Sequence, residues 1–146
     1  MSPLQVEIVC EDIDFMPTKS TAGSLGLDLK ANLELEEIFF NPLETIKIDA
    51  GFSLSIPYGY HAKIVSRSGM SSKGIVVTNA PGIIDSDYRG RICVLLTNVS
   101  KEIRTIKNKT RIAQMFFEKN IDTEFVKVTE LNHTDRGSGG FGSTGT

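Results

Sequence analysis

The chain has 146 residues, of which 40% are hydrophobic and 23% are charged, and its formal net charge at pH 7 is −2. These values are typical of one folded domain with its own core, and the slightly negative charge argues against a broad nucleic-acid-binding face, although not against a local basic pocket. The N-terminus has no basic segment followed by an apolar one, and nowhere do 18 apolar residues run together, so we expect an intracellular protein, cytoplasmic or nuclear, with no membrane or nucleic-acid partner.

Alternating segments make up the first half of the chain. Apolar residues at every second position predict strands at residues 4–10, 27–35, 45–48, 51–56 and 60–65. The intervening stretch 12–26 is rich in Asp, Pro, Thr, Ser and Gly, which predicts a long loop. A short helix is expected only within residues 66–74.

The second half continues the same pattern. Strands are expected at residues 74–78, 92–96, 103–106, 111–118 and 125–129. Turn residues between the first two of these predict a hairpin followed by a tight bend into a buried strand. About nine short strands with almost no helical periodicity predict an all-β sandwich or barrel over residues 1–131. The glycine-rich residues 132–146 predict a flexible C-terminal arm.

The cysteines and histidines do not have the spacing of a metal or disulfide site. Cys10 and Cys93 lie in apolar alternating segments, which favours small core residues over a disulfide or a metal pair. His61 and His133 have no Cys or His at ligand spacing, which argues against zinc.

Residues 79–92 hold the first candidate site. Asp85, Asp87 and Tyr88 lie between two turns and next to apolar strands. Two carboxylates and an aromatic ring in this setting suggest a binding site, and an Asx-rich turn is the alternative interpretation.

The C-terminal arm is the second candidate. Its glycines expose backbone N–H groups that can surround phosphate oxygens, and Arg136, Ser143 and Thr144 add donors for an anion. Phe141 is suited to closing over a planar base. The alternative is a disordered tail with an incidental Phe and Arg.

Polar residues within or next to apolar segments suggest a third site. Arg67 and Ser68 precede the expected helical turn, whose amides favour an anion. Gln114 interrupts an apolar strand, either as a satisfied core amide or as a ligand contact. Asp28 interrupts another strand, and several such exceptions suggest one shared polar pocket.

Taken in order, these segments resemble the five motifs of the homotrimeric dUTPase family. The matching stretches are residues 23–29, 67–69, 79–90, 111–115 and 136–145. The resemblance implies a β jelly roll, a homotrimer with active sites at subunit interfaces, and Mg²⁺-dependent hydrolysis of dUTP to dUMP and pyrophosphate. Such an activity limits uracil incorporation into DNA and supplies dUMP for thymidylate synthesis.

The third motif then implies the chemistry and the nucleoside contacts. Asp85 would be the carboxylate that activates water for attack at the α-phosphorus. Tyr88 would lie against the deoxyribose and exclude a 2′-hydroxyl. Asn79 and the hairpin around Gly82 and Ile84 would bind uracil.

The other motifs imply the phosphate and metal contacts. Phosphates would be held by Arg67, Ser68, Gly69 and Gln114, with Mg²⁺ bound mainly by the phosphates and water and with Asp28 in a supporting place. In the arm, Arg136 would act in catalysis and bind the γ-phosphate, Phe141 would stack on uracil, and further contacts would come from Gly142, Ser143 and Thr144.

Some positions depart from the family pattern. Lys30 and Arg91 stand where an Arg and an acidic residue are expected, Lys109 and Thr110 replace a usual Gly-Asp, and Leu25 occupies a position that is usually small. None of these residues is assigned to the chemistry. They put loop geometry and interface contacts in question.

Two rival functions are compatible with the same fold. A dCTP deaminase would need a proton-shuttling glutamate after the third motif, and residues 92–98 contain none. A nucleotide-binding regulatory protein would not need Asp85 together with Tyr88, Arg136 and Phe141.

Overall fold

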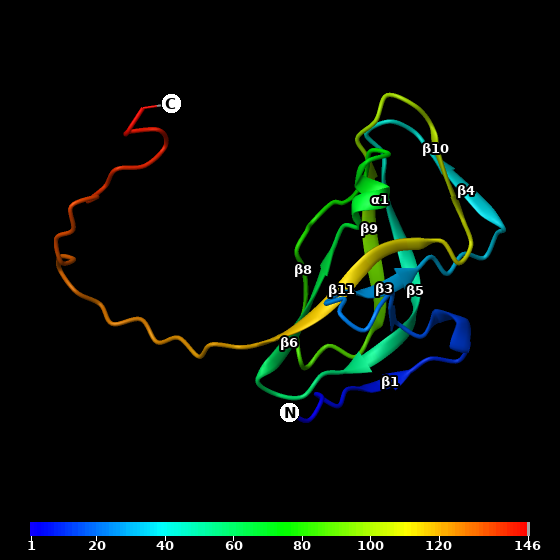
Figure 1. The fold of residues 1–146 in the computed structure, drawn as a ribbon, viewed down its shortest axis with the longest axis horizontal. Coiled ribbons are helices and arrows are strands. Elements are labelled where there is room, and N and C mark those ends of the chain that lie inside the picture. Colours follow the sequence, from blue (N-terminus) through cyan, green and yellow to red (C-terminus); the bar gives the residue numbers. More distant parts are fainter. Residues whose placement is uncertain (146) are drawn as a thin grey trace.

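The computed structural model describes residues 1–145 and is built almost entirely of antiparallel strands (Figure 1). A four-stranded sheet has the order β1-β5-β9-β7, a five-stranded sheet has the order β2-β3-β11-β6-β8, and β10 pairs with β4 in a two-stranded sheet. The predicted all-β class with one short helix is confirmed. No helix within these residues is long and apolar enough to cross a membrane.

The elements have the following bounds. The four-stranded sheet contains β1 (Glu7–Val9), β5 (Thr45–Ser55), β9 (Arg91–Asn98) and β7 (Ile75–Val77). The five-stranded sheet contains β2 (Thr18–Lys19), β3 (Leu27–Lys30), β11 (Arg111–Lys119), β6 (Tyr60–Val65) and β8 (Gly82–Ile84). The remaining elements are β4 (Glu37–Phe40), β10 (Arg104–Lys107), the helix α1 (Ser68–Ser71) and the 3₁₀ turn η1 (Ile13–Phe15).

Both large sheets contribute to one core. Along β9, every second residue is buried, and the same alternation along β6 buries Ala62 and Ile64. These side chains join Phe40 and Phe52, which are almost fully buried, in a single hydrophobic cluster. Burial of a large apolar side chain contributes roughly 1.5–3 kcal/mol, so this cluster holds the sheets together.

Strand β5 corrects one prediction. Residues 45–48 and 51–56 were expected as two strands, but a single strand spans both, with a register shift between Asp49 and Ser53. Gly51 has φ +91° in this irregular part, and a Cβ atom there would lie 2.6 Å from Cγ of Phe15. The glycine therefore marks a bulge packed against η1 and does not end the strand.

The predicted hairpin within residues 79–92 is wrong. Strand β7, before the Ala80-Pro81 turn, pairs with β9, whereas β8, after this turn, pairs with β6. The turn therefore carries the chain from one sheet to the other. The loop from β8 to β9 returns it, and this loop contains Asp85 and Tyr88.

The N-terminal predictions are only partly correct. Strand 4–10 shrinks to β1, strand 27–35 ends at Lys30, and Leu35 is 66% exposed. The expected loop 12–26 contains η1 and β2. Side-chain alternation extends beyond the residues that find a backbone partner, which explains the overlong predictions.

The strand predicted at residues 125–129 does not form. Residues 120–145 contain no strand, and Phe125 is 95% exposed. Figure 1 shows this segment leaving the end of β11 and running away from the sheets. Its one backbone hydrogen bond to the rest of the described chain is at its start, from the N–H of Asn120 to the carbonyl of Gly59. The division at residue 131 stays a prediction, and Thr146, the last residue of the arm, lies outside the described residues.

Candidate active site

A buried carboxylate, Asp28, is the centre of one polar cluster. It is 8% exposed, its Oδ1 lies 3.0 Å from Nε of Arg67, and its Oδ2 accepts a 2.9 Å hydrogen bond from Ser20. Nε of Arg111 lies 3.9 Å from the same Oδ2. These contacts offset the desolvation of the carboxylate. Asp28 thereby fixes the orientation of the Arg67 guanidinium through Nε.

Gln114 belongs to the same cluster because β3 and β11 pair Asp28 with Gln114. Its Nε2 donates a 2.9 Å hydrogen bond to the carbonyl of Ser66. A Cβ atom on Gly26 would overlap Oε1 of Gln114, so any other residue here would force the Gln114 amide to shift. Gln114 is half-buried, and its other amide hydrogen stays available for a ligand.

The start of α1 lies beside this cluster. Arg67 is the residue before the helix, and its Nη1 donates a 3.1 Å hydrogen bond to the carbonyl of Arg111. Ser68 and Gly69 are exposed in the first turn. The structure thus brings together four predicted phosphate-binding residues: Arg67, Ser68, Gly69 and Gln114.

Asp85 and Tyr88 form a second group in the loop after β8. The backbone N–H of Tyr88 donates a 3.2 Å hydrogen bond to the carbonyl of Asp85, which closes a tight turn. Their side chains line one hollow together with Ile83, Ile84, Arg91 and Cys93. Asp85 is exposed, and no ion pair among residues 1–145 includes it.

Asn79 and Gly82 lie on either side of the turn that precedes β8. A Cβ atom on Gly82 would lie 3.3 Å from Nδ2 of Asn79, so the amide packs close to the bare backbone of the glycine. Asn79 is exposed, whereas Gly82 is buried and Ile84 half-buried. The amide can therefore face a ligand while the strand behind it stays fixed.

The arm forms a third group that only local contacts organise. Nε of Arg136 donates a 2.9 Å hydrogen bond to the carbonyl of Gly139, and Gly142 has φ +81° in a turn. Phe141 is fully exposed. The hollow around these residues is lined by the arm alone, and Figure 1 shows the arm far from the sheets.

Strand β6 separates the first two groups. In its ladders, Ala62 pairs with Ile84, which places Asp85 next to His61, while Val65 pairs with Gln114. His61 and Asp85 line a common hollow, as this register requires. Four residues of a strand span about 13 Å, so Asp85 and Gln114 lie at opposite ends of β6.

Comparisons with known proteins decide the family. The dUTPase family profile matches residues 14–145. The chain belongs to the dUTPase family.

Curated relatives support this membership over nearly the whole length. A deoxyuridine 5′-triphosphate nucleotidohydrolase of Fusobacterium nucleatum is 42% identical over 146 residues, covering 99% of each chain. One of Finegoldia magna is 45% identical over 143 residues, covering 97% of this chain and 99% of the relative. The predicted family resemblance is confirmed.

Solved dUTPase structures support the fold. A mutant dUTPase of Staphylococcus bacteriophage 80alpha, solved with dUpNHpp, has a TM-score of 0.83 at 24% identity and covers 97% of this chain and 99% of its own. A mutant dUTPase from phage phi11 of S. aureus, described with a structural Mg(II) ion, has a TM-score of 0.75 at 22% identity and covers 88% of this chain and 99% of its own. The predicted jelly-roll-like fold is therefore confirmed.

The described part of this dUTPase family member has no cluster of three or more His, Cys, Asp or Glu that could hold a metal ion. Cys10 and Cys93 are free thiols and are half-buried, so they are less enclosed than core residues. Burial raises the pKa of the Cys93 thiol, with a further contribution from the charge of Asp49. The Cys93 thiol, which lines the same hollow as Asp85, is therefore in its neutral form.

The structure also shows contacts that the sequence motifs did not predict. Ser20 binds Asp28 because β2 pairs with β3, and Arg91 binds Asp49 across β5 and β9. Ser20 lies in a stretch full of small polar residues, so no local signal distinguished it. Arg91 carried a signal, because it departs from the family pattern.

Proposed function

We propose that the chain hydrolyses dUTP to dUMP and pyrophosphate, and that Asp85 accepts the proton of the attacking water. The bond from the water oxygen to the α-phosphorus forms as the bond from this phosphorus to the bridging oxygen breaks, and pyrophosphate leaves. The observation that carries the proposal is the exposed carboxylate of Asp85, which has no ion-pair partner among the described residues and lines a hollow with Tyr88. The nucleotidohydrolase relatives at 42–45% identity support the choice of substrate.

The nucleoside would be bound around the same loop. Tyr88 presents its ring at this hollow and would pack against the deoxyribose, so that an added 2′-hydroxyl meets steric overlap and finds no partner. Asn79 would hydrogen-bond the uracil edge, with the backbone near Gly82 and Ile84 forming the wall of the slot. The close packing of Asn79 against Gly82 supports a slot with little spare room.

The phosphates would be bound at the other end of β6. Arg67 uses Nε for Asp28 and Nη1 for the carbonyl of Arg111, so Nη2 is its remaining terminal group for a phosphate oxygen. Ser68, Gly69 and Gln114 would add neutral donors. In the arm, Arg136 with the glycines and hydroxyls of residues 142–144 would bind the γ-phosphate, and Phe141 would stack on uracil.

Magnesium would be held by the phosphates and water. Both Asp28 oxygens already have partners, Arg67 and Ser20, which restricts Asp28 to contact through a bound water. This donor set fits Mg²⁺, which keeps several waters and binds substrate phosphates instead of an all-protein cage. When bound, the ion neutralises charge that develops on the phosphates.

A homotrimer would bring the three groups together. Asp85 and Gln114 lie about 13 Å apart along β6, and the arm extends away from both. Sites shared between subunits would combine these groups around one nucleotide. The reaction would then limit uracil incorporation into DNA and supply dUMP for thymidylate synthesis in the cytoplasm or nucleus.

One assay tests the activity. The purified chain is incubated with Mg²⁺ and, separately, dUTP, UTP or dCTP, and pyrophosphate and ammonia are measured. We expect pyrophosphate from dUTP, little from UTP, and no ammonia. Ammonia from dCTP would support the deaminase, and tight dUTP binding without pyrophosphate would support a regulatory protein.

Light scattering on the same active preparation tests the assembly. We expect a mass of three 16.0 kDa chains. An active preparation at the mass of one chain would contradict the shared site.

A further inference from the structure

The hydroxyl of Tyr88 is held by the main chain three residues further on. Oη donates a 2.9 Å hydrogen bond to the carbonyl oxygen of Arg91. The intervening Gly90 leaves room for the phenol, since a Cβ atom there would lie 2.5 Å from Oη. Tyr88 is 45% exposed, so packing alone does not fix the ring. The ring position therefore depends on where the Arg91 carbonyl lies.

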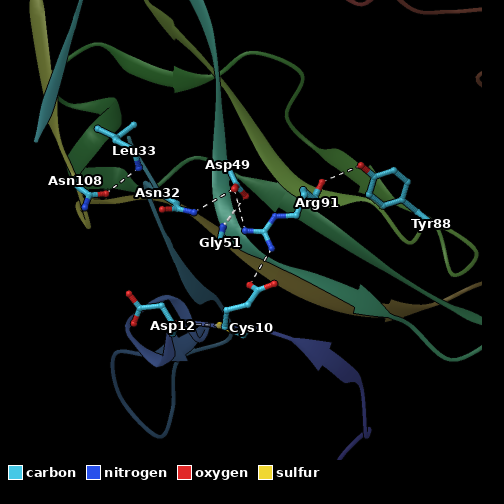
Figure 2. Close-up of polar contacts among 10 residues, drawn as sticks. Cys10, Asp12, Asn32, Leu33, Asp49, Gly51, Tyr88, Arg91 and Asn108 are labelled. Carbon is cyan, nitrogen blue, oxygen red and sulfur yellow. Dashed lines mark hydrogen bonds and ion pairs between the residues drawn. The ribbon is translucent and has the colours of Figure 1, made fainter. Parts of the chain in front are cut away.

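The side chain of Arg91 reaches away from Tyr88 and contacts two other segments (Figure 2). Nη2 lies 3.0 Å from Oδ2 of Asp49 in β5, and Nη1 lies 3.3 Å from Oε2 of Glu11, just after β1. The hydrogen bond with Asp49 is the main cause of a raised pKa for Arg91, so the guanidinium stays charged. Glu11 is 70% exposed against 34% for Asp49, which makes Asp49 the less screened partner.

Asp49 is itself fixed by two donors. Its Oδ1 accepts a 2.9 Å hydrogen bond from the backbone N–H of Gly51, and its Oδ2 accepts one of 3.2 Å from Asn32. Figure 2 shows Gly51 contacting the carboxylate from the same strand and Asn32 from another segment. Asp49 is therefore a rigid acceptor for the guanidinium of Arg91.

The ion pair bridges an irregular part of the ladder between β5 and β9. Cys93 pairs with Asp49 and Arg91 pairs with Ser53, so a step of two residues in β9 faces a step of four in β5. The unequal spacing interrupts the backbone hydrogen bonds that would otherwise fix the start of β9. The Arg91–Asp49 contact joins the two sides of this bulge and fixes the main chain of Arg91.

We propose that Arg91, anchored by Asp49, is a positioning residue for Tyr88 and thereby contributes to discrimination against a ribose 2′-hydroxyl. The inference rests on the proposed function, because it assigns Tyr88 to the sugar. In this role Arg91 acts through its carbonyl, while its guanidinium is engaged by Asp49 and Glu11. A purely structural ion pair would affect unfolding while leaving the choice between deoxyribose and ribose unchanged.

A mutant cycle tests the coupling. Arg91→Met keeps most of the side-chain bulk and removes the charge, and Tyr88→Phe removes only the hydroxyl. Each is expected to lower the ratio of kcat/KM for dUTP to that for UTP about fivefold, the worth of one net hydrogen bond. The double variant should lose no more than either single one. Independent, additive losses, or an unchanged ratio in Arg91→Met, would overturn the proposal.

Matched variants separate positioning from general destabilisation. Asp49→Asn is nearly isosteric and should shift the ratio in the same direction, and Arg91→Lys should restore part of it. Lys109→Met breaks a different surface ion pair, with Asp14 at 2.6 Å, and should leave the ratio unchanged. A similar shift in Lys109→Met would show that loss of any surface pair produces the effect.

A spectroscopic measurement on the full-length protein makes the inference independent of turnover. The chain has three tyrosines, so ¹⁹F spectra of fluorotyrosine-labelled protein contain few signals, and Tyr88→Phe assigns one of them. Arg91→Met should shift or broaden the Tyr88 signal, whereas Lys109→Met should not. An unchanged Tyr88 signal would refute positioning. If the wild-type protein leaves dUTP intact while Arg91→Met still shifts the Tyr88 signal, the proposed function alone would be refuted.

Discussion

The β domain and the C-terminal arm would supply parts of one site, but the residues of the domain are held by buried contacts and those of the arm by local contacts in solvent. In the domain, Asp28 is buried and has partners from three other segments, so the groups that would bind phosphate are tied to the packing of the sheets. In the arm, Arg136 bonds to a carbonyl three residues away and Phe141 is fully exposed. Substitutions in the Asp28 cluster should therefore affect stability and binding together, whereas changes in the arm should affect binding and turnover without affecting stability.

The largest effect is expected for Asp85→Asn, which tests whether an exposed residue of the β domain affects turnover without affecting stability. Asp85 belongs to the sheet region yet is as exposed as an arm residue, so its loss should spare the fold. The amide cannot accept the proton of water, and kcat should fall roughly 10²–10⁴-fold. Single-turnover kinetics measures the rate of hydrolysis, and calorimetry with dUpNHpp checks that the folded variant still binds nucleotide. Near wild-type turnover would show that another group is the base.

Truncation after Asp135 should have the next largest effect. Loss of Arg136 and the arm hydroxyls removes stabilisation of phosphate charge, which should lower kcat about 10²–10³-fold. The core ends with β11, so the melting temperature should change by no more than about one degree. Kinetics and thermal melting are measured on the same preparation. Full activity, or a lowered melting temperature, would contradict the separation between domain and arm.

Gly26→Ala should show the opposite behaviour. The added Cβ overlaps Oε1 of Gln114 and lies 3.1 Å from its Cβ, so the amide must move away from the carbonyl of Ser66. Overpacking of this kind costs about 1–3 kcal/mol of unfolding free energy, and KM should rise with it. Chemical denaturation and steady-state kinetics measure the two changes. Gly140→Ala, at an arm position with open space, is the matched control and should leave the unfolding free energy unchanged.

Phe141→Ala tests whether the arm binds the base by stacking. Loss of stacking on the base should weaken nucleotide binding about tenfold, since such contacts contribute roughly 1–3 kcal/mol. The apparent affinity for dUpNHpp measures this effect. Phe125 is also almost fully exposed, at 95%, but lies before the arm, so Phe125→Ala is the matched control. A larger loss of affinity in Phe125→Ala than in Phe141→Ala would show that the stacking residue lies outside the arm.

The smallest effect concerns acid stability of the domain. Lys63, at 2.8 Å, and His61, at 3.5 Å, hold the pKa of Glu118 below its ordinary value of 4.5. A lowered native pKa stabilises the fold above the unfolded pKa, and this stabilisation is lost as pH falls through the native pKa. Glu118→Gln should therefore lower the melting temperature slightly near pH 7, and this difference should shrink as the pH falls below 4.5. Glu124→Gln, outside all strands, should match wild type over the whole range of pH.

Local sequence predicted the strands more reliably than their pairing. Residues 60–65 form β6 with the predicted bounds, because alternation and the flanking Pro-Tyr-Gly turn agree there. The turn at residues 80–81 was correctly placed, but the pattern of its flanks could not show that β7 and β8 join different sheets. Residues 125–129 alternate as a strand does, yet a strand also needs an edge to pair with.

For the candidate site too, the sequence predicted individual residues but not their long-range contacts. The family resemblance named Asp28, Arg67 and Gln114, and the structure places them in one cluster. It also named Asp85 and Tyr88, which line one hollow. Contacts such as Ser20 with Asp28 or Arg91 with Asp49 depend on segments that are distant in sequence. Neither residue type nor spacing could have paired them.

The extended segment after β11 has a consequence for the lifetime of the protein in a cell. A protease needs an accessible stretch of backbone, and residues 120–138 are exposed and outside every strand. One cut there would release Arg136 and Phe141 and leave the packed sheets intact. Cleavage would then remove the arm without unfolding the sheets, and the cleaved product would keep its melting temperature and most of its mass.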